Sequence, residues 1–308
     1  MAKGWEIEGL RSGLPLSECA RLIILTKFRE AFSYQNLVHT SEDIEVIHDM
    51  RVSLRRLWAA MTSFSHYFDH NKKFSRLSIC TRKLARKLGS VRDLDVLIEL
   101  LEKHIEHLPD KPLAVLAINY IVSNCQAKRL QQRTKLFNYM EKLAQKEFER
   151  KFLAFFEAIQ SNVKVHNKRK KAIFLNTLKN FYKQDPKDGF SSEALHQFRI
   201  AAKKLRYSLE FFEMCFNQPL SQELKTLREI QELLGDLHDC DVMVGLLKKY
   251  RRAHKGHQEL LLGLKELAIH FKHKRKENLT LFQELWHLDF QNNFRIGLEE
   301  ALSTKVEA

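Results

Sequence analysis

Residues 196–207 read HQFRIAAKKLRY, a histidine followed by regularly spaced cations. Arg199, Lys203 and Arg206 follow His196 at positions i+3, i+7 and i+10. A helix turns by about 100° per residue, so it gathers these four side chains within an arc of roughly 80°. The neighbouring arc is apolar and carries Leu195, Phe198, Ala202, Leu205 and Leu209. A solvated face would lie opposite the apolar residues, so this arrangement predicts a lined groove or channel that holds something anionic.

The same pattern occurs near the start of the chain. Residues 48–57 read HDMRVSLRRL and match at a shift of 148 residues, from His48 to His196. The matched pairs are His48 with His196, Arg51 with Arg199, Arg55 with Lys203 and Arg56 with Lys204. The cationic row is therefore present twice.

A second block repeats downstream of each row. Residues 88–96 read LGSVRDLDV and residues 234–242 read LGDLHDCDV, at a shift of 146 residues. Two blocks in the same order at nearly one shift indicate an internal duplication. The period is too long for a solenoid, so we expect two copies of a helical unit related by a pseudo-twofold axis.

The composition favours long helices. The chain has 308 residues, of which 44% are hydrophobic, with only 10 Gly and 5 Pro to interrupt helices. No segment of useful length alternates as a strand would. The predicted fold class is all-α, with two similar helical bundles. We assign residues 1–15 to an N-terminal segment, residues 16–163 to the first repeat and residues 164–308 to the second.

The cysteine pattern and the hydropathy of the chain predict a protein of a reducing compartment. The chain has an odd number of cysteines and no CxxC pair, at Cys19, Cys80, Cys125, Cys215 and Cys240. A disulfide framework or zinc site is not expected, and a reducing compartment fits better. No signal-peptide pattern opens the chain, and no apolar run is long enough to predict a membrane span. We expect a cytoplasmic protein.

The net charge of +14 points to a polyanionic partner. Arginines on facing helices can fork onto phosphate oxygens, and histidine can donate to phosphate or hold a neighbour in place. A regular row of cations could track a chain of phosphates, and its binding would weaken steeply with salt. Further cations lie outside the rows, at Arg82, Arg86, Arg129, Arg133, Arg228, Lys272 and Lys276. We match Lys272 and Lys276 with Arg129 and Arg133, at a shift of 143 residues.

Carboxylates in the repeated block leave two interpretations open. Asp93 and Asp95, with Asp239 and Asp241 in the repeat, could hold a divalent cation. We favour a plainer role, in which they cap the helix after each glycine and hold nearby arginines. The pairs His48-Asp49 and His238-Asp239 are also found in metal phosphohydrolases, but no water-activating constellation accompanies them. We therefore predict no catalytic residue, no metal site and no cofactor.

These motifs together resemble the conserved histidine α-helical domain family, abbreviated CHAD. The resemblance rests on the His-x-x-Arg rows at His48 and His196 and on the blocks at residues 88–96 and 234–242, and it extends from about residue 15 to residue 300. It implies two four-helix bundles around a basic central channel. It also implies non-enzymatic binding of inorganic polyphosphate, with an accessory or targeting role at polyphosphate granules.

The resemblance assigns roles to the cations. The main polyphosphate contacts would be Arg51, Arg55, Arg199, Lys203 and Arg206. His48 and His196 would bind phosphate or support the cations. Further charge would come from Arg56, Lys204, Arg82, Arg86, Arg129, Arg133, Arg228, Lys272 and Lys276. Two other functions remain as alternatives. One is a nucleic-acid-binding module, with nucleic acid held only as a nonspecific polyanion, and the other is a metal-dependent phosphohydrolase.

The two halves differ at three matched positions. Trp58 stands where Arg206 stands in the second row. Glu232 aligns with Arg86, and His238 aligns with Arg92. We expect the second helix pair of the second half to bind more weakly, and the Lys272 to Lys276 cluster to offset the loss.

Overall fold

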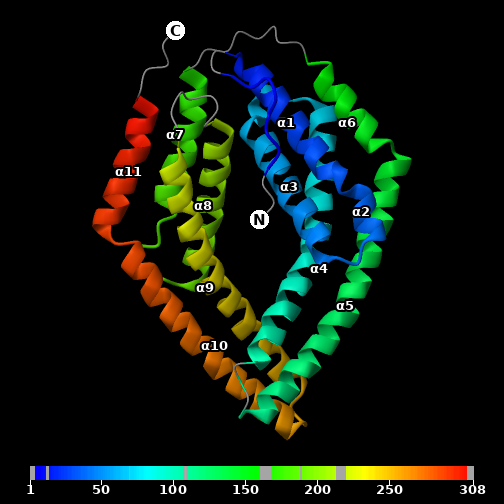
Figure 1. Ribbon diagram of the computed structural model, residues 1–308, viewed down its shortest axis with the longest axis vertical. Coiled ribbons are helices and arrows are strands. Elements are labelled where there is room, and N and C mark those ends of the chain that lie inside the picture. The colour runs from blue at the N-terminus through cyan, green and yellow to red at the C-terminus, as the bar shows by residue number, and fades with distance from the viewer. Residues whose placement is uncertain are drawn as a thin grey trace. The chain divides into compact units, whose positions relative to one another are not determined.

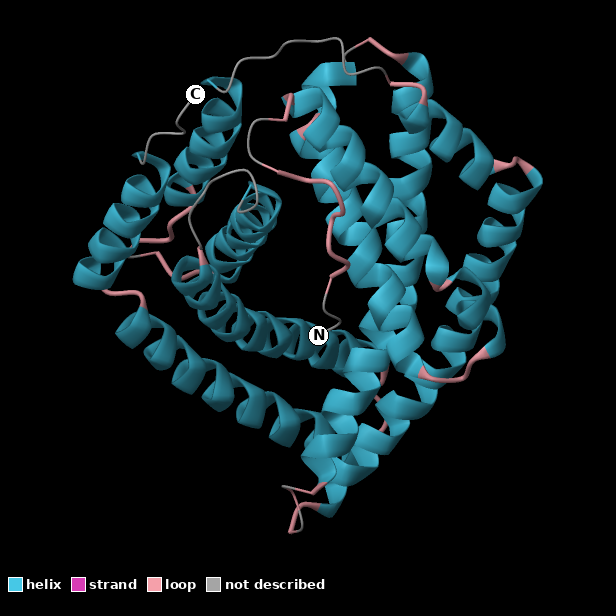
Figure 2. Cartoon of the chain, turned by 45° about the horizontal axis from the view of Figure 1, so that its top comes forward, coloured by secondary structure: helices cyan, strands magenta, loops and turns pink. Residues whose placement is uncertain are grey.

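The computed structural model describes residues 4–11, 14–68, 70–106, 108, 110–159, 168–187, 189–212 and 220–303. Within these ranges the regular structure is helical and no strand occurs (Figure 2), which confirms the all-α prediction. Cys215 and the predicted repeat boundary after residue 163 lie outside the described residues. The helices are α1 (Leu16–Ser33), α2 (Gln35–Thr40), α3 (Ile44–Ser63), η1 (Ser65–Phe68, a 3-10 helix), α4 (Lys72–Ile105), α5 (Pro112–Gln145), α6 (Phe148–Glu157), α7 (Lys168–Lys183), α8 (Ser192–Phe212), α9 (Ser221–Ala253), α10 (Gln258–Leu285) and α11 (Leu288–Ser303).

The glycines of the repeated block lie inside helices. Gly89 falls within α4 and Gly235 within α9, and both helices run on without a break. The predicted capping role implied that a helix starts after each glycine, and the structure instead shows a continuation. A glycine inside a helix costs roughly 1 kcal/mol relative to alanine. At Gly89 an added Cβ would lie 3.4 Å from Nε of Arg51, which is ordinary van der Waals contact, so the structure gives no steric reason for a glycine at this position.

The chain divides into two compact units. The first comprises Met1–Leu100 with Ser123–Ile173, and the second comprises Leu101–Val122 with Phe174–Ala308. The end of α4 and the start of α5 therefore group with the second unit. Each unit is thus made of two separate segments, whereas the sequence repeats are each one continuous segment.

Aromatic side chains form much of the core of the first unit. Phe28 of α1 stacks on Phe152 of α6, with ring centroids 3.9 Å apart, and both are fully buried. Phe68 of η1 stacks on Phe74 of α4 at 4.4 Å. Figure 1 shows α1, α3 and α4 running side by side in this unit. Helix α3 buries Ile47, Met50, Leu54 and Leu57, so one of its faces lies against this core.

A buried ionic cluster lies beside this aromatic core. Glu30 is 1% exposed and pairs with Nζ of Lys27 at 2.9 Å and with Nη1 of Arg56 at 3.5 Å. Its carboxylate also accepts hydrogen bonds from Oγ of Ser53 and from the backbone N–H of Trp5. A carboxylate this deeply buried needs such partners, because an unpaired buried charge is costly.

The core of the second unit is built in a similar way. Phe181 of α7 stacks on Phe198 of α8 at 4.8 Å, and Phe198 lies 5.2 Å from the ring of Trp286. A close helix crossing lies elsewhere in the unit, where α10 meets the start of α5. A Cβ added to Gly263 would lie 1.9 Å from the carbonyl oxygen of Leu113, so only glycine fits there.

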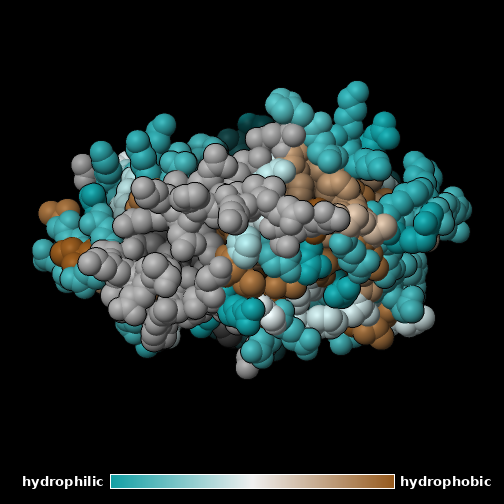
Figure 3. Space-filling view, turned by 90° about the horizontal axis from the view of Figure 1, so that it is seen from above, coloured by the Kyte–Doolittle hydropathy of each residue, from teal (hydrophilic) through white to brown (hydrophobic). Residues whose placement is uncertain are grey.

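Charged residues make up 29% of the chain. Hydrophilic side chains dominate the outline of the view in Figure 3, and hydrophobic ones gather in smaller patches. Within the described ranges, none of the helices combines the length and the apolar character that a membrane span needs.

Candidate anion-binding site

Helix α3 presents the first cationic row at the edge of the core. Asp43 caps the helix, because its carboxylate accepts a hydrogen bond from the N–H of Glu45 at 2.9 Å. The side chains of Met50, Leu54 and Leu57 are fully buried, whereas His48, Arg51 and Arg55 are half-buried. The predicted row bordered by apolar residues is therefore present on this helix.

Helix α8 presents the second row in the same way. The predicted apolar neighbours are buried, with exposures of 3% or less at Leu195, Phe198, Ala202, Leu205 and Leu209. His196, Arg199 and Lys203 are half-buried beside them. Cations in such a position are less screened by water and salt than fully exposed ones, so they attract an anion more strongly.

Helix α4 supplies a carboxylate to the first row. Nη2 of Arg51 lies 2.9 Å from Oδ1 of Asp93, and the Arg51 side chain is 25% exposed while that of Asp93 is 69% exposed. This contact holds Arg51 in an extended position while an anion in solution could still approach it.

The histidine of the first row lies in a positive environment. Arg92 of α4 is 7% exposed and pairs with Glu45 of α3, with 3.1 Å between Nη2 and Oε1. Burial lowers the pKa of His48, and the charge of Arg92 lowers the pKa of His48 further. His48 is therefore neutral at pH 7 and can donate one hydrogen bond to an oxyanion.

The second row meets a histidine where the first meets an arginine. The rings of His196 on α8 and His238 on α9 lie 4.9 Å apart. Burial lowers the pKa of His238 to about 4, and the charges of Arg199, His196 and Lys203 act in the same direction, against a smaller opposing effect of Asp241. This pair is the structural counterpart of His48 with Arg92.

A sequence model of the CHAD domain matches residues 23–248. The chain belongs to the CHAD domain family. In a comparison with solved structures, the crystal structure of the CHAD domain from the plant Ricinus communis matches with a TM-score of 0.67 at 22% identity, covering 99% of this chain and 97% of that one. PptA from Streptomyces chartreusis matches with a TM-score of 0.66 at 12% identity, covering 88% of this chain and 98% of that one. No curated protein sequence matches. At these identities the structural matches establish the fold.

The aspartates of the CHAD motif hold arginines inside long helices. Asp95 of α4 pairs with Arg129 of α5, and Oδ1 of Asp241 on α9 lies 2.6 Å from Nε of Arg275 on α10. The predicted capping role is wrong, because these residues lie in helix interiors. The predicted arginine-holding role is confirmed for Asp93, Asp95 and Asp241.

These pairs correct one alignment between the halves. Asp95 and Asp241 are 146 residues apart, and so are their partners Arg129 and Arg275. The shift of 143 residues that matched Lys272 with Arg129 is therefore wrong, and Lys272 and Lys276 lie exposed on α10. Arg275 was missed as a candidate, although the shift of the block at residues 88–96 would have found it. Arg275 also reaches the carbonyl oxygen of Phe190, ahead of α8, at 3.5 Å.

Three predicted phosphate contacts are buried and already engaged. Arg56 is 8% exposed and pairs with Glu30, and Arg133 is 7% exposed and pairs with Glu42. Arg206 is 6% exposed, pairs with Glu210 at 3.1 Å and lies over the ring of Tyr207. Because their carboxylates already neutralise them, we leave these arginines out of the proposed phosphate contacts. Arg129, tied to Asp95, is treated in the same way.

The remaining candidates are exposed. Arg82 lies over the ring of Trp58 on α3, 5.9 Å from its centroid, which places it at the end of the first row. Arg86, Lys204 and Arg228 are exposed on α4, α8 and α9. These side chains can add long-range attraction, which salt screens readily.

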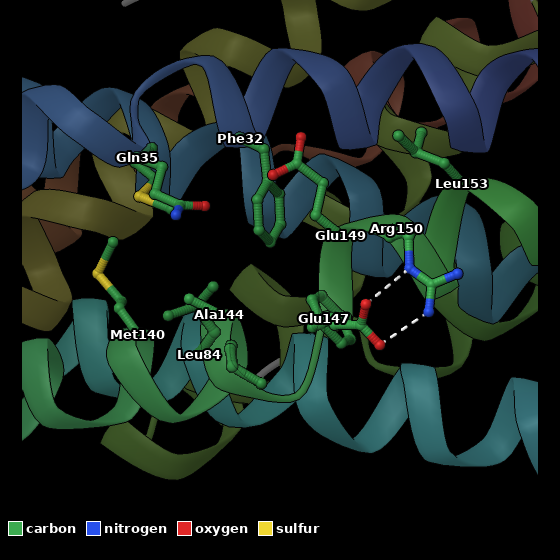
Figure 4. A pocket seen from close by; sticks show the side chains of 12 residues that line it. Phe32, Gln35, Leu84, Met140, Ala144, Glu147, Glu149, Arg150 and Leu153 are labelled. Atoms are coloured by element: carbon green, nitrogen blue, oxygen red, sulfur yellow. Dashed lines mark hydrogen bonds and ion pairs between the residues drawn. The ribbon is translucent and has the colours of Figure 1, made fainter.

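A pocket of about 470 Å³ in the first unit lies apart from the CHAD motif cations (Figure 4). Phe32 and Met140 are among its lining residues, and Glu147 and Arg150 form an ion pair beside it, with 2.7 Å between Oε2 and Nη2. Its lining is mainly apolar and includes no member of either row. Among the described residues, no three histidine, cysteine or acidic side chains come together as a possible metal site.

Proposed function

We propose that this chain binds inorganic polyphosphate, without catalysis, through the half-buried cations of α3 and α8. The observation that carries the proposal is the repetition of one row on both helices, each flanked by fully buried apolar side chains. A solvated helix face would place its cations opposite the core. The row therefore differs from ordinary surface charge in both copies.

The proposed contacts are His48, Arg51 and Arg55 in the first unit, and His196, Arg199 and Lys203 in the second. A guanidinium presents two parallel N–H groups that match two oxygens of one phosphate. The spacing of i, i+3 and i+7 follows one edge of each helix, so cations about 4.5–6 Å apart along the axis can contact a linear phosphate chain at intervals. A sequence-independent polyanion needs no more specific recognition than this.

Family membership supports the same ligand, since CHAD domains are linked with polyphosphate binding. An accessory or targeting role at polyphosphate granules follows for a protein that binds the polymer and leaves it intact. Three aspartates of the repeated block, Asp93, Asp95 and Asp241, are each engaged by an arginine, which supports a binding rather than a hydrolytic role.

A titration with long-chain polyphosphate at several salt concentrations tests the proposal. Arg51→Gln combined with Arg199→Gln removes one guanidinium from each row without adding negative charge. We expect this double variant to lose at least about tenfold in affinity, and its plot of log K against log salt to be less steep by about two phosphate contacts.

The matched control is Lys248→Gln with Lys249→Gln, two exposed lysines of α9 outside the rows. It removes the same total charge and should change the affinity by less than about twofold, as expected for exposed charges in salt. RNA of equal charge serves as competitor. Equal losses in both double variants, or displacement of polyphosphate by RNA at equal charge, would overturn the proposal in favour of nonspecific polyanion binding.

A further inference from the structure

A basic groove lies between α4 and α5 in the first unit, on the side of α4 that faces α5. It encloses about 510 Å³, and its lining combines lysines with the apolar residues Ile79 and Leu143 around Tyr139. Five lysines line it, at Lys83, Lys87, Lys135, Lys142 and Lys146. None of its lining residues is acidic.

The groove is distinct from the α3 row. Lys83 and Lys87 point toward α5, because their ammonium groups lie 5.3 Å and 5.7 Å from the centroid of the Tyr139 ring. Arg82, one residue earlier, instead lies over Trp58 of α3. Helix α4 therefore directs its basic residues to two different surfaces.

Tyr139 fixes the floor of the groove. Its hydroxyl donates to the carbonyl oxygen of Cys80, at 3.4 Å, so the ring is anchored across the two helices. The face of the ring holds two ammonium groups close together through cation–π attraction. Two like charges on one ring form a local positive centre that favours an anion.

No carboxylate lines the groove, although Glu141 and Glu147 are sequence neighbours of Lys142 and Lys146. Residues 72–92 of α4 and residues 123–140 of α5 contain no Asp or Glu. Among the described residues, none of the five lysines forms an ion pair with a carboxylate. Like charges at such spacing repel one another, and a multiply charged anion would relieve the repulsion.

The fold does not require this charge. At the shift of 146 residues set by the aspartate–arginine pairs, the second half carries Glu229, Leu233, Leu281 and Leu285 at the places of Lys83, Lys87, Lys135 and Tyr139. The same helix pair thus tolerates one acidic and three apolar residues. The lysines are a feature of the first half alone.

We propose that the α4–α5 groove binds a compact oligophosphate anion, at a site separate from the α3 and α8 rows. Lysine ammoniums are point charges that bind phosphate without demanding a planar partner. The volume falls within the range of small-ligand sites, roughly 300–1,000 Å³. Cations already occupy the face of Tyr139, so recognition relies on charge density and not on stacking of a base.

Calorimetric titration of the full chain with tripolyphosphate, at fixed ionic strength, tests the groove. The groove variant combines Lys83→Gln, Lys87→Gln and Lys142→Gln. It should lose one tripolyphosphate site, or at least about tenfold in affinity for it. Relief of like-charge repulsion opposes the loss of the two cation–π contacts with Tyr139, so the variant's thermal midpoint should stay near that of the wild type. A thermal melt of the variant checks that loss of binding is not unfolding.

The matched control is Lys248→Gln, Lys249→Gln and Lys265→Gln, three exposed lysines of the second unit. It removes the same charge and should keep wild-type tripolyphosphate binding. An equal loss in the control, unchanged binding in the groove variant or no tripolyphosphate binding by the wild type would each overturn the inference. The inference stands apart from the proposed function, because Arg51→Gln with Arg199→Gln should weaken long-chain polyphosphate binding and leave the groove site intact.

Discussion

The histidine of each row lies near a different partner residue. The difference changes the charge beside the row while the row itself is kept. In the first unit His48 lies near Arg92, a permanent cation that pairs with Glu45. In the second unit His196 lies 4.9 Å from His238, which is neutral at pH 7 because its pKa is about 4. Arg92 therefore gives the first row a permanent positive charge. The charge that His238 gives the second row depends on whether its ring is protonated.

The matched cations Arg56 and Lys204 extend the contrast. Arg56 is buried against Glu30, while Lys204 is exposed on α8. The same position in the repeat therefore stabilises the core in one half and faces solvent in the other. A duplicated sequence pattern predicts where a helix lies better than it predicts what each cation does.

Among the variants that test the contrast between Arg56 and Lys204, Glu30→Gln should have the largest effect on stability. The change leaves Lys27 and Arg56 buried without a countercharge, so we expect the free energy of unfolding to fall by about 3–5 kcal/mol. Denaturant unfolding measures it. Glu299→Gln, which breaks an exposed pair with Arg295, should cost less than about 1 kcal/mol. Similar losses in the two variants would show that the Glu30 cluster is not a buried network.

Arg275→Gln should have the next largest effect. It leaves Asp241, whose side chain is 18% exposed, without its guanidinium, and we expect a loss of about 1–3 kcal/mol in unfolding free energy. Lys272→Gln with Lys276→Gln should change stability by no more than about 0.5 kcal/mol, because both side chains are exposed. The reverse order would restore the alignment of Lys272 with Arg129.

Replacing His238 by arginine should make the second row resemble the first. Glu193 aligns with Glu45 at the shift of 148 residues and can receive the new guanidinium. We expect His238→Arg to tighten polyphosphate binding at pH 7.5 by roughly tenfold, equivalent to about 1.4 kcal/mol. Titrations at pH 7.5 and 5.5 check it. Equal affinity at pH 7.5 would show that the second row does not sense position 238.

The wild type should show a matching pH dependence. Because the pKa of His238 is depressed in the folded state, its protonation favours the unfolded chain. Its contribution to stability is full above about pH 6.5 and is lost as the pH falls toward 4. A bound polyanion would raise this pKa, so binding should take up protons in the same window. Calorimetry in buffers of different ionisation enthalpy measures the uptake, which His238→Gln should reduce.

The smallest effect should follow from Asp93→Asn. Asp93 is largely exposed, so loss of its pair with Arg51 should cost no more than about 1 kcal/mol of stability. Removing a negative charge beside the row should nonetheless tighten polyphosphate binding, by about two- to fivefold at low salt. Weaker binding in this variant would indicate that Asp93 positions Arg51 more than it competes for it.

Local sequence patterns predicted the helices and the cationic rows. They did not predict which cations are buried and paired, because such pairing depends on contacts between residues far apart in sequence. The spacing of Leu195, Phe198 and Ala202 placed the core face of α8 correctly, because helical periodicity is a local property. The burial of Arg56 could not be read from its own neighbours, since it depends on Glu30, 26 residues away on α1. A sequence row does not record which cations already have a carboxylate.

The capping role predicted for Asp93 and Asp95 was wrong for a similar reason. A glycine followed by Asp93 and Asp95 looks like a helix boundary, and the sequence favoured capping. Packing overrides that local preference, because α4 continues for ten residues past Asp95 and the carboxylates are engaged from neighbouring helices. The groove between α4 and α5 was missed because its lysines come from segments about 50 residues apart.

Both compact units are drawn from segments that end inside helices. The junctions at Leu100–Leu101, Val122–Ser123 and Ile173–Phe174 fall within α4, α5 and α7. A protease that cuts exposed loops finds no linker at these points, and neither does a cloning boundary chosen to express one unit alone. Each unit combines two separate stretches of the chain, so a single cut at any of these junctions would break a helix and release neither unit whole.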